Sequence, residues 1–284
     1  MDDERAAFLY QEIRSDTGCA RIIGITGAPG TGKSTLIDGL ISTLRARSHT
    51  VAVVAVDPSS LFSGGAILGD RLRMHSHTAD DGVFIRSLST RGHLGGLTPA
   101  VHSITHILEF AGFDHIILET VGTGQSEIEI AEIARTVVVL CAPGMGDDVQ
   151  TLKAGVLEIA DILVVNKADL AGADRTVQQL KAMLALRPPV DDQVPVLQTT
   201  AMTASGLDEL ADAIDDHGGK DSVDNAGRRR VRTRRLLASR VGALLQQQLL
   251  RHGDDNLDAL CEALERGERS LEDSARDVLK LKYP

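Results

Sequence analysis

One short stretch near the start of the chain constrains its fold more than any other feature. Residues 27–34 read Gly-Ala-Pro-Gly-Thr-Gly-Lys-Ser, which matches the P-loop pattern Gly-x-x-x-x-Gly-Lys-Ser/Thr. The apolar run 22–25 precedes this stretch, and the apolar-rich segment 35–41 follows it. A strand, a glycine loop and a helix in this order aim backbone N–H groups and the positive end of the helix at one anion. The sequence therefore predicts a nucleoside triphosphate site.

The positions of this loop have distinct predicted roles. Lys33 can reach the β- and γ-phosphates of the nucleotide, and the hydroxyl of Ser34 can ligate Mg²⁺. The remaining predicted nucleotide contacts are Gly27, Ala28, Pro29, Gly30, Thr31, Gly32 and Thr35.

The composition suits a buried parallel sheet. Of the 284 residues, 43% are hydrophobic, but only 2% are aromatic and none is Trp, so the core must be aliphatic. Continuous Val, Ile and Leu runs are typical of parallel strands that are covered on both faces.

Charge and cysteine usage exclude several classes of protein. The net charge of −10 argues against a nucleic-acid binder. The three Cys residues lack metal-ligand spacing, and no apolar run is long enough for a membrane span. The first 20 residues contain no apolar signal-peptide core. We therefore expect a cytoplasmic protein that binds neither nucleic acid nor membrane.

Apolar runs alternate with helical segments along most of the chain, which predicts a doubly wound α/β fold with a mostly parallel sheet. The expected strands are 22–25, 51–56, 83–86, 115–118, 136–140, 162–165 and 194–198. Polar motifs directly follow these strands, and ligands of open α/β sheets bind at the carboxyl ends of strands. We divide the chain into a short N-terminal helical segment (1–20), a P-loop nucleotide-binding domain (21–217) and a C-terminal helical extension (218–284). The polar stretch 216–221 is the expected linker.

The base of the nucleotide is predicted by Asn166-Lys167-Ala168-Asp169. Asp169 can accept two hydrogen bonds from guanine, whereas adenine offers no matching donor pair. Asn166 can bond the base from the side, and the aliphatic stem of Lys167 can lie on the ring. Thr200 and Ala201 follow the next strand and can offer a backbone N–H to the guanine carbonyl oxygen.

Several carboxylates follow strands on the same predicted edge. Asp57 and Glu119 can support a Mg²⁺ ion, and Gly122 lies where a GTPase senses the γ-phosphate. A turn or cap role for Asp57 remains open.

Two further residues are candidates for catalysis. Asp70 lies in a glycine-containing loop, where the alternative is a helix N-cap, and Gln125 can orient the attacking water. The segment 143–150 can be a third switch or a simple helix cap.

The histidines and arginines are less informative. His102 and His106 have metal-ligand spacing, but a solvated or packed pair is the favoured interpretation. The basic run 228–235 suits a solvated helix face or salt bridges between subunits better than binding of nucleic acid or an acidic partner. An apolar stripe in the helix that follows, 236–249, can pack on its own domain or form a dimer interface.

The ordered motifs closely resemble the MeaB/ArgK family of methylmalonyl-CoA mutase-associated GTPases. The resemblance rests on residues 27–34, on Val-Asp-Pro-Ser-Ser (56–60), on Gly-Gly-Ala-Ile-Leu-Gly-Asp-Arg (64–71), on Glu-Thr-Val-Gly-Thr-Gly-Gln-Ser-Glu (119–127) and on Asn-Lys-Ala-Asp (166–169). It covers about residues 21–200, and the segment before the P-loop is shorter than is usual in the family.

The resemblance implies a G-protein chaperone for an adenosylcobalamin-dependent acyl-CoA mutase, with methylmalonyl-CoA mutase as the first candidate. It implies catalytic and metal-supporting carboxylates at Asp57, Asp70 and Glu119, a homodimer formed through the tail, and Mg²⁺ with GTP or GDP as ligands. The alternatives are a nucleotide-dependent kinase and a metallochaperone GTPase.

Overall fold

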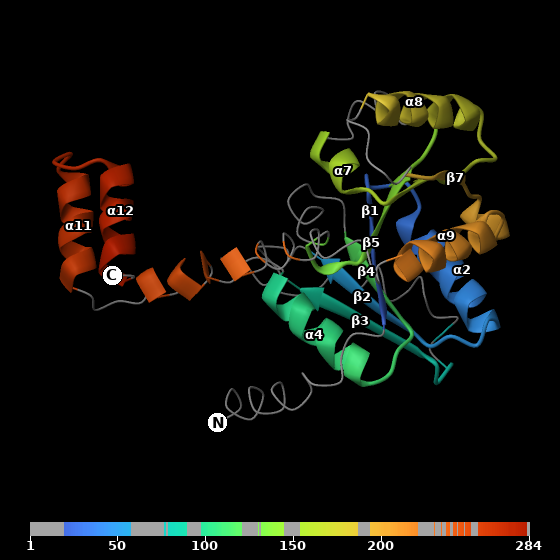
Figure 1. Cartoon of the computed structure of the whole chain (residues 1–284), viewed down its shortest axis with the longest axis horizontal. Coiled ribbons are helices and arrows are strands. Elements are labelled where there is room, and N and C mark those ends of the chain that lie inside the picture. The colour runs from blue at the N-terminus through green and yellow to red at the C-terminus, as the bar shows by residue number, and fades with distance from the viewer. Residues whose placement is uncertain are drawn as a thin grey trace.

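A seven-stranded parallel sheet forms the centre of the molecule (Figure 1). The computed structural model describes residues 20–57, 77, 79–89, 98–120, 130, 132–144, 154–186, 194–220 and 255–282, with separate residues and short runs between 230 and 250. The strands are β1 (Arg21–Gly27), β2 (Val51–Asp57), β3 (Val83–Ser89), β4 (His115–Thr120), β5 (Thr136–Cys141), β6 (Ile162–Val165) and β7 (Val196–Gln198). They lie side by side in the order β3-β2-β4-β1-β5-β6-β7.

Helices cover both faces of this sheet, as the doubly wound prediction requires. The helices are α2 (Lys33–Ala46), α4 (Thr98–Phe110), α7 (Ala154–Ile159), α8 (Ala173–Ala185), the short 3-10 helix η2 (Ala201–Thr203), α9 (Leu207–Lys220), α11 (Asp255–Glu265) and α12 (Leu271–Lys282). Helices α2 and α9 pack on one face, and α4, α7 and α8 pack on the other (Figure 1). The α/β fold class is therefore confirmed.

The two hydrophobic cores follow from the two-residue period of a strand. In β1, Ile22 belongs to the core under α4 and α8, whereas Ile23 belongs to the core under α2 and α9. Both residues are buried, and so is the rest of the strand from Ile22 to Gly27. A strand that is buried on both faces reads as a continuous apolar run, which is why the sequence revealed it.

The predicted linker at 216–221 was largely wrong, because α9 continues to Lys220. Its last turns are held by the sheet domain. Arg21 Nε lies 2.7 Å from Asp215 Oδ1. The side chains of Thr136 and His217 form a hydrogen bond of 2.9 Å. These contacts stabilise the end of α9 more than the low helix propensity of Gly218 and Gly219 destabilises it. The proposed domain boundary at 217 therefore falls inside a helix.

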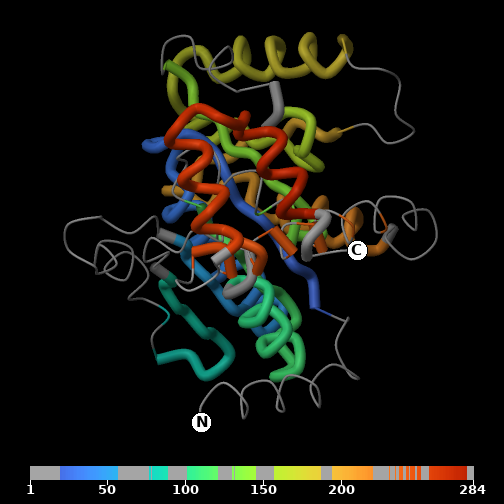
Figure 2. The backbone as a smooth tube through the Cα atoms, turned by 90° about the vertical axis from the view of Figure 1, so that its left-hand side faces the viewer, coloured from blue at the N-terminus to red at the C-terminus, as the bar shows by residue number. Residues whose placement is uncertain are grey.

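The C-terminal helices α11 and α12 form a hairpin that lies apart from the sheet (Figure 1). In Figure 2 the same two helices, in red, are seen in front of the sheet domain. The described residues between 230 and 249 are helical. No helix in the described part of the chain is long and apolar enough to cross a membrane.

Gly24 allows a helical segment to approach the centre of the sheet. A Cβ atom at this position would overlap Ile130 Cγ2 and would lie 2.9 Å from Ala134 Cβ. Both neighbours are buried side chains, so neither can swing into solvent. The close approach therefore requires glycine at the middle of β1.

We expect Gly24→Ala to lower the free energy of unfolding by about 1–3 kcal/mol, because the added methyl group overpacks this contact. Urea denaturation followed by circular dichroism measures the change. Gly219→Ala is the matched control, since a Cβ there would meet nothing within 4 Å. Equal unfolding midpoints for Gly24→Ala and the wild-type protein would contradict the packing argument.

Two stacked histidines, of which His115 is buried and His49 is half-buried, lie at the amino end of the sheet, away from the P-loop. His115, 1% exposed, stacks on His49 with ring centroids 4.8 Å apart, and its Nε2 lies 3.4 Å from Asp215 Oδ1. Burial lowers the pKa of His115 below its ordinary value, and His49 and Arg21 lower it further, whereas Asp215 partly opposes the shift. His115 is therefore neutral in the folded protein at neutral pH.

This pKa shift predicts a loss of stability in mild acid. Between the lowered folded-state pKa and the ordinary value near 6.5, the unfolded chain binds more protons than the folded one. The free energy of unfolding should then fall as the pH drops from about 7 to about 5. Urea titrations at several pH values measure how the free energy of unfolding depends on pH. His115→Gln removes the titrating group and should weaken this pH dependence. An unchanged pH dependence in this variant would exclude His115 as its source.

Candidate functional site

The predicted phosphate loop connects β1 to α2 at the carboxyl edge of the sheet. Its turn is closed by Thr31, whose Oγ1 donates to the Ala28 carbonyl at 2.9 Å. Gly32 has φ of +90°, and a Cβ there would lie 2.6 Å from Asn166 Nδ2, so both backbone conformation and space require glycine. Helix α2 begins at Lys33, and its first N–H groups face this loop, as in an anion site.

Lys33 is almost fully buried inside the loop, with 8% of its surface exposed. Its Nζ donates hydrogen bonds to the carbonyl oxygens of Gly27, at 2.7 Å, and Ala28, at 3.1 Å. The ammonium group is thus held where the loop curls, next to the N-terminus of α2. The loop that surrounds this ammonium group is the one predicted to hold the phosphate groups.

Ser34 and Glu119 meet beside the loop. The Ser34 Oγ donates to Glu119 Oε1 at 2.8 Å, and both residues are buried. A hydroxyl and a carboxylate are hard oxygen ligands of the kind that Mg²⁺ prefers, so this pair fits the predicted metal site. Within the described residues, no group of three or more His, Cys, Asp or Glu side chains is suited to a metal. Phosphate oxygens and water would have to complete the coordination, as is usual for Mg²⁺.

The predicted base-recognition residues are joined directly to the phosphate loop. Asn166 Nδ2 donates to the Thr31 carbonyl at 2.9 Å, and Lys167 Nζ donates to the Gly30 carbonyl at 2.8 Å. Lys167 adopts φ of +57°, which turns the chain sharply after β6. Asp169 is exposed, so its carboxylate is accessible to a ligand. The two motifs therefore form one continuous site.

The predicted role of Thr200 and Ala201 differs from what the structure shows. The Thr200 N–H donates to the Ser205 carbonyl at 3.0 Å, and the Ala201 N–H donates to Asn166 Oδ1 at 3.2 Å. The turn that brings Thr200 opposite Ser205 uses the first N–H, and the side chain of Asn166 uses the second. Neither N–H is left to the guanine carbonyl in this arrangement.

Sequence reasoning missed Thr199, which is 1% exposed. Its Oγ1 donates to Asn166 Oδ1 at 3.1 Å, so Thr199 fixes the side chain of Asn166 from the opposite end. The available signal was a threonine at the carboxyl end of the last predicted strand, facing the same edge as Asn166.

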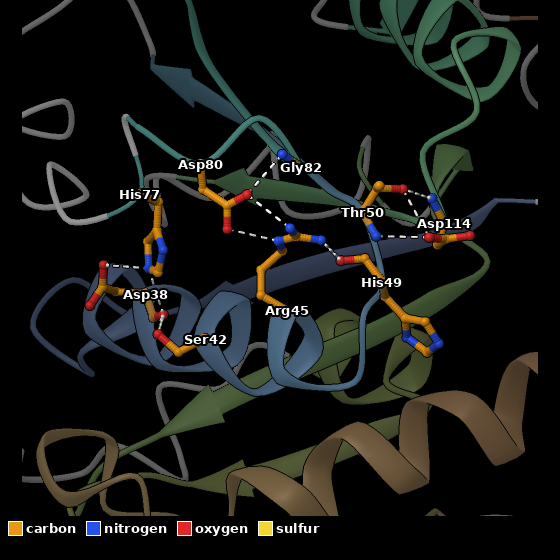
Figure 3. Close-up of polar contacts among 9 residues, drawn as sticks. All are labelled: Asp38, Ser42, Arg45, His49, Thr50, His77, Asp80, Gly82 and Asp114. Carbon is orange, nitrogen blue, oxygen red and sulfur yellow. Dashed lines mark hydrogen bonds and ion pairs between the residues drawn. The ribbon is translucent and has the colours of Figure 1, made fainter.

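The outer side of α2 is anchored to the turn before β3 (Figure 3). Arg45 forms two hydrogen bonds of 2.8 Å with the Asp80 carboxylate, which lower the pKa of Asp80. Nearer the P-loop end of the helix, His77 Nε2 lies 3.2 Å from Asp38 Oδ1. These contacts fix the helix whose first residues are Lys33 and Ser34.

Some predicted site residues lie outside the described residues. They are Asp70, Gly122, Gln125 and most of the segment 143–150. Asp57 ends β2 at the predicted edge, but its side chain is outside the described part. His102 and His106 are half-buried on α4, and their ring centroids lie 4.4 Å apart.

Three features define a P-loop nucleotide-binding protein of the GTPase class: this loop, the buried Ser34–Glu119 pair and the adjoining turn that is predicted to recognise the base. The family model described as "Methylmalonyl Co-A mutase-associated GTPase MeaB" matches residues 1–257. The chain belongs to this MeaB family of GTPases, as its motifs predicted.

Individual relatives agree with this assignment. A protein of Pyrococcus abyssi that is described as a "Putative GTPase" is 45% identical over 248 residues, which cover 86% of this chain and 76% of the relative. GTPase ArgK of Escherichia coli K12 is 38% identical over 227 residues, or 78% of this chain and 67% of ArgK. A crystal structure of a LAO/AO transport system kinase has a TM-score of 0.72 at 25% identity and covers 98% of this chain and 86% of its own.

Proposed function

We propose that this GTPase is a Mg²⁺-dependent switch that acts in the cytoplasm as a chaperone of an adenosylcobalamin-dependent acyl-CoA mutase. The observation that carries the proposal is the buried hydrogen bond between Ser34 and Glu119. It links the phosphate loop to the last residues of β4, and the chain leaves β4 directly toward Gly122. A change at the phosphates can therefore be passed to the segment after β4. The family description, which names methylmalonyl-CoA mutase, supports that enzyme as the partner.

The reaction is GTP hydrolysis, in which water attacks the γ-phosphorus in line. The bond between the γ-phosphorus and the β–γ bridging oxygen breaks, and that oxygen leaves with GDP. Lys33 and the N–H groups at the start of α2 hold the phosphates and balance their charge. Ser34 and Glu119, together with Asp57, would hold Mg²⁺, which supplies further charge stabilisation when bound. We assign the orientation of the attacking water to Asp70 and Gln125.

The partner is tested by adding purified methylmalonyl-CoA mutase to the GTPase. Phosphate release from GTP should rise when the cognate mutase is present, and it should fall when Mg²⁺ is removed with EDTA. ATP in place of GTP controls for base recognition. If a saturating amount of mutase from the same organism leaves the rate unchanged, the switch proposal is wrong, although the GTPase assignment stands.

A phosphotransferase is the second candidate, because one solved structure with a similar fold is that of a LAO/AO transport system kinase. Incubation with GTP labelled at the γ-phosphate separates the two reactions. Label in inorganic phosphate alone supports hydrolysis, whereas label in a protein or small-molecule acceptor supports transfer. The metallochaperone alternative predicts tight binding of Ni²⁺ or Zn²⁺, which equilibrium dialysis measures.

We also propose that the C-terminal helices form a homodimer. Large apolar side chains are exposed along this extension, namely Leu237, Val241, Leu244, Leu250, Leu271 and Leu279. Helical stripes of this kind are stable when a partner surface covers them. Light scattering on the full chain gives the oligomeric state directly.

A further inference from the structure

A second buried polar contact lies directly beside the Ser34–Glu119 pair. Thr120 Oγ1 donates a hydrogen bond of 2.9 Å to Thr26 Oγ1, and both residues are 0% exposed. Thr26 is the residue before the phosphate loop begins at Gly27, and Thr120 is the last residue of β4. Strands β1 and β4 are neighbours in register, with Ile25 opposite Glu119.

The two contacts lie on opposite faces of the sheet. Ile117 belongs to the core under α2, whereas Ile116 and Leu118 belong to the core under α4 and α8. By the two-residue period of a strand, Glu119 shares the α2 face with Ile117, and Thr120 shares the other face with Leu118. The end of β4 is thus held from both sides, by Ser34 through Glu119 and by Thr26 through Thr120.

The hydroxyl pair forms a directional hydrogen bond, which an aliphatic pair in the same place would not. Valine has nearly the same shape as threonine and would suit this apolar face, but it makes no directional bond. Strand ends tend to open where the ladder stops, and residue 120 is the last residue of β4. A hydrogen bond at this point fixes the position of the last two residues of β4 relative to β1.

We propose that Thr26 and Thr120 are positioning residues that keep the Glu119 carboxylate against Ser34, and thereby keep the predicted Mg²⁺ site assembled. This inference rests on the proposed Mg²⁺-dependent GTPase function and deepens it. Neither threonine touches the nucleotide in this role, because each acts through its neighbour in sequence, Thr120 through Glu119 and Thr26 through the start of the phosphate loop.

The test compares Thr120→Val and Thr26→Val with the double variant. We expect each single variant to lower kcat for GTP hydrolysis roughly 10-fold and to raise the Mg²⁺ concentration for half-maximal activity by a similar factor, with little change in KM for GTP. The double variant should be no worse than either single variant, because both remove the same bond. Thr120→Ser retains the hydroxyl and should restore most of the activity.

Hydrogen–deuterium exchange on the nucleotide-free protein provides a readout that does not depend on hydrolysis. Amides at the end of β4 should exchange faster in Thr120→Val than in the wild-type protein. Thr105→Val is the matched control, since Thr105 is 2% exposed and its hydroxyl donates within α4, to the Val101 carbonyl at 2.7 Å. This control should leave the exchange at β4 and the Mg²⁺ dependence unchanged.

The outcomes separate the inference from the proposed function. Wild-type values of kcat, Mg²⁺ dependence and β4 exchange in Thr120→Val would overturn the positioning role. A wild-type protein that hydrolyses GTP equally well without Mg²⁺ would overturn the metal-dependent function instead. Faster exchange at β4 in Thr120→Val would then still support the anchoring contact, whereas unchanged exchange would overturn that as well.

Discussion

Replacing Lys33 with alanine should lower kcat for GTP hydrolysis by roughly 100- to 1000-fold, the range found when one preorganised charge-stabilising group is removed from an active site. The Lys33 ammonium is buried at the curl of the phosphate loop and bonded to the carbonyls of Gly27 and Ala28. A charge that is fixed beforehand in a site poor in water stabilises developing charge without reorganisation. Phosphate release under saturating GTP measures the loss.

The control for this prediction is Lys181→Ala, which removes an exposed lysine from α8. Both variants should be checked by circular dichroism, because Lys33 also bonds the loop itself. A Lys33→Ala protein that folds and keeps more than about a third of the wild-type rate would exclude Lys33 from transition-state stabilisation.

Asp169→Asn should change the nucleotide preference from guanine to xanthine. Two charge-assisted hydrogen bonds to the guanine N1–H and N2–H₂ are lost, and at about 1.5–3 kcal/mol each the affinity for GTP should fall at least 100-fold. Xanthine has a carbonyl oxygen in place of the amino group, which matches the amide of asparagine. The affinity for xanthosine triphosphate should therefore rise.

Fluorescence titration with labelled guanosine and xanthosine nucleotides measures both affinities. Asp216→Asn replaces an exposed carboxylate of α9 and should leave both unchanged. If Asp169→Asn lowered the affinity for both nucleotides equally, Asp169 would stabilise the loop but would not recognise the base.

Local patterns explain why much of the fold could be predicted from the sequence. The run at 162–165 predicts β6 residue for residue, because a strand buried on both faces is continuously apolar and has sharp limits. The last predicted strand, 194–198, begins two residues too early, since β7 covers only Val196–Gln198 at the sheet edge. The order of the strands follows from pairings that no local pattern contains.

In the site, too, local sequence patterns could be recognised, whereas contacts between residues far apart in the chain could not. Lys33, Ser34 and Asp169 belong to contiguous motifs, so roles for them could be predicted from short stretches of sequence. The Thr26–Thr120 bond and the Thr199–Asn166 bond join residues far apart in the chain. Threonine is common in strands for its shape alone, so neither residue gives a functional signal before the strands are paired.

The position of β1 in the sheet has a consequence for synthesis of the chain. Its two neighbours are β4 and β5, which end at Thr120 and Cys141. The phosphate loop therefore leaves the ribosome long before the strands that must flank it, and Asn166, which braces that loop, follows later still. Guanine nucleotide should consequently stabilise only a nearly complete domain. Arrested nascent chains that end before β6 should fail to retain labelled nucleotide, whereas chains released beyond η2 should retain it.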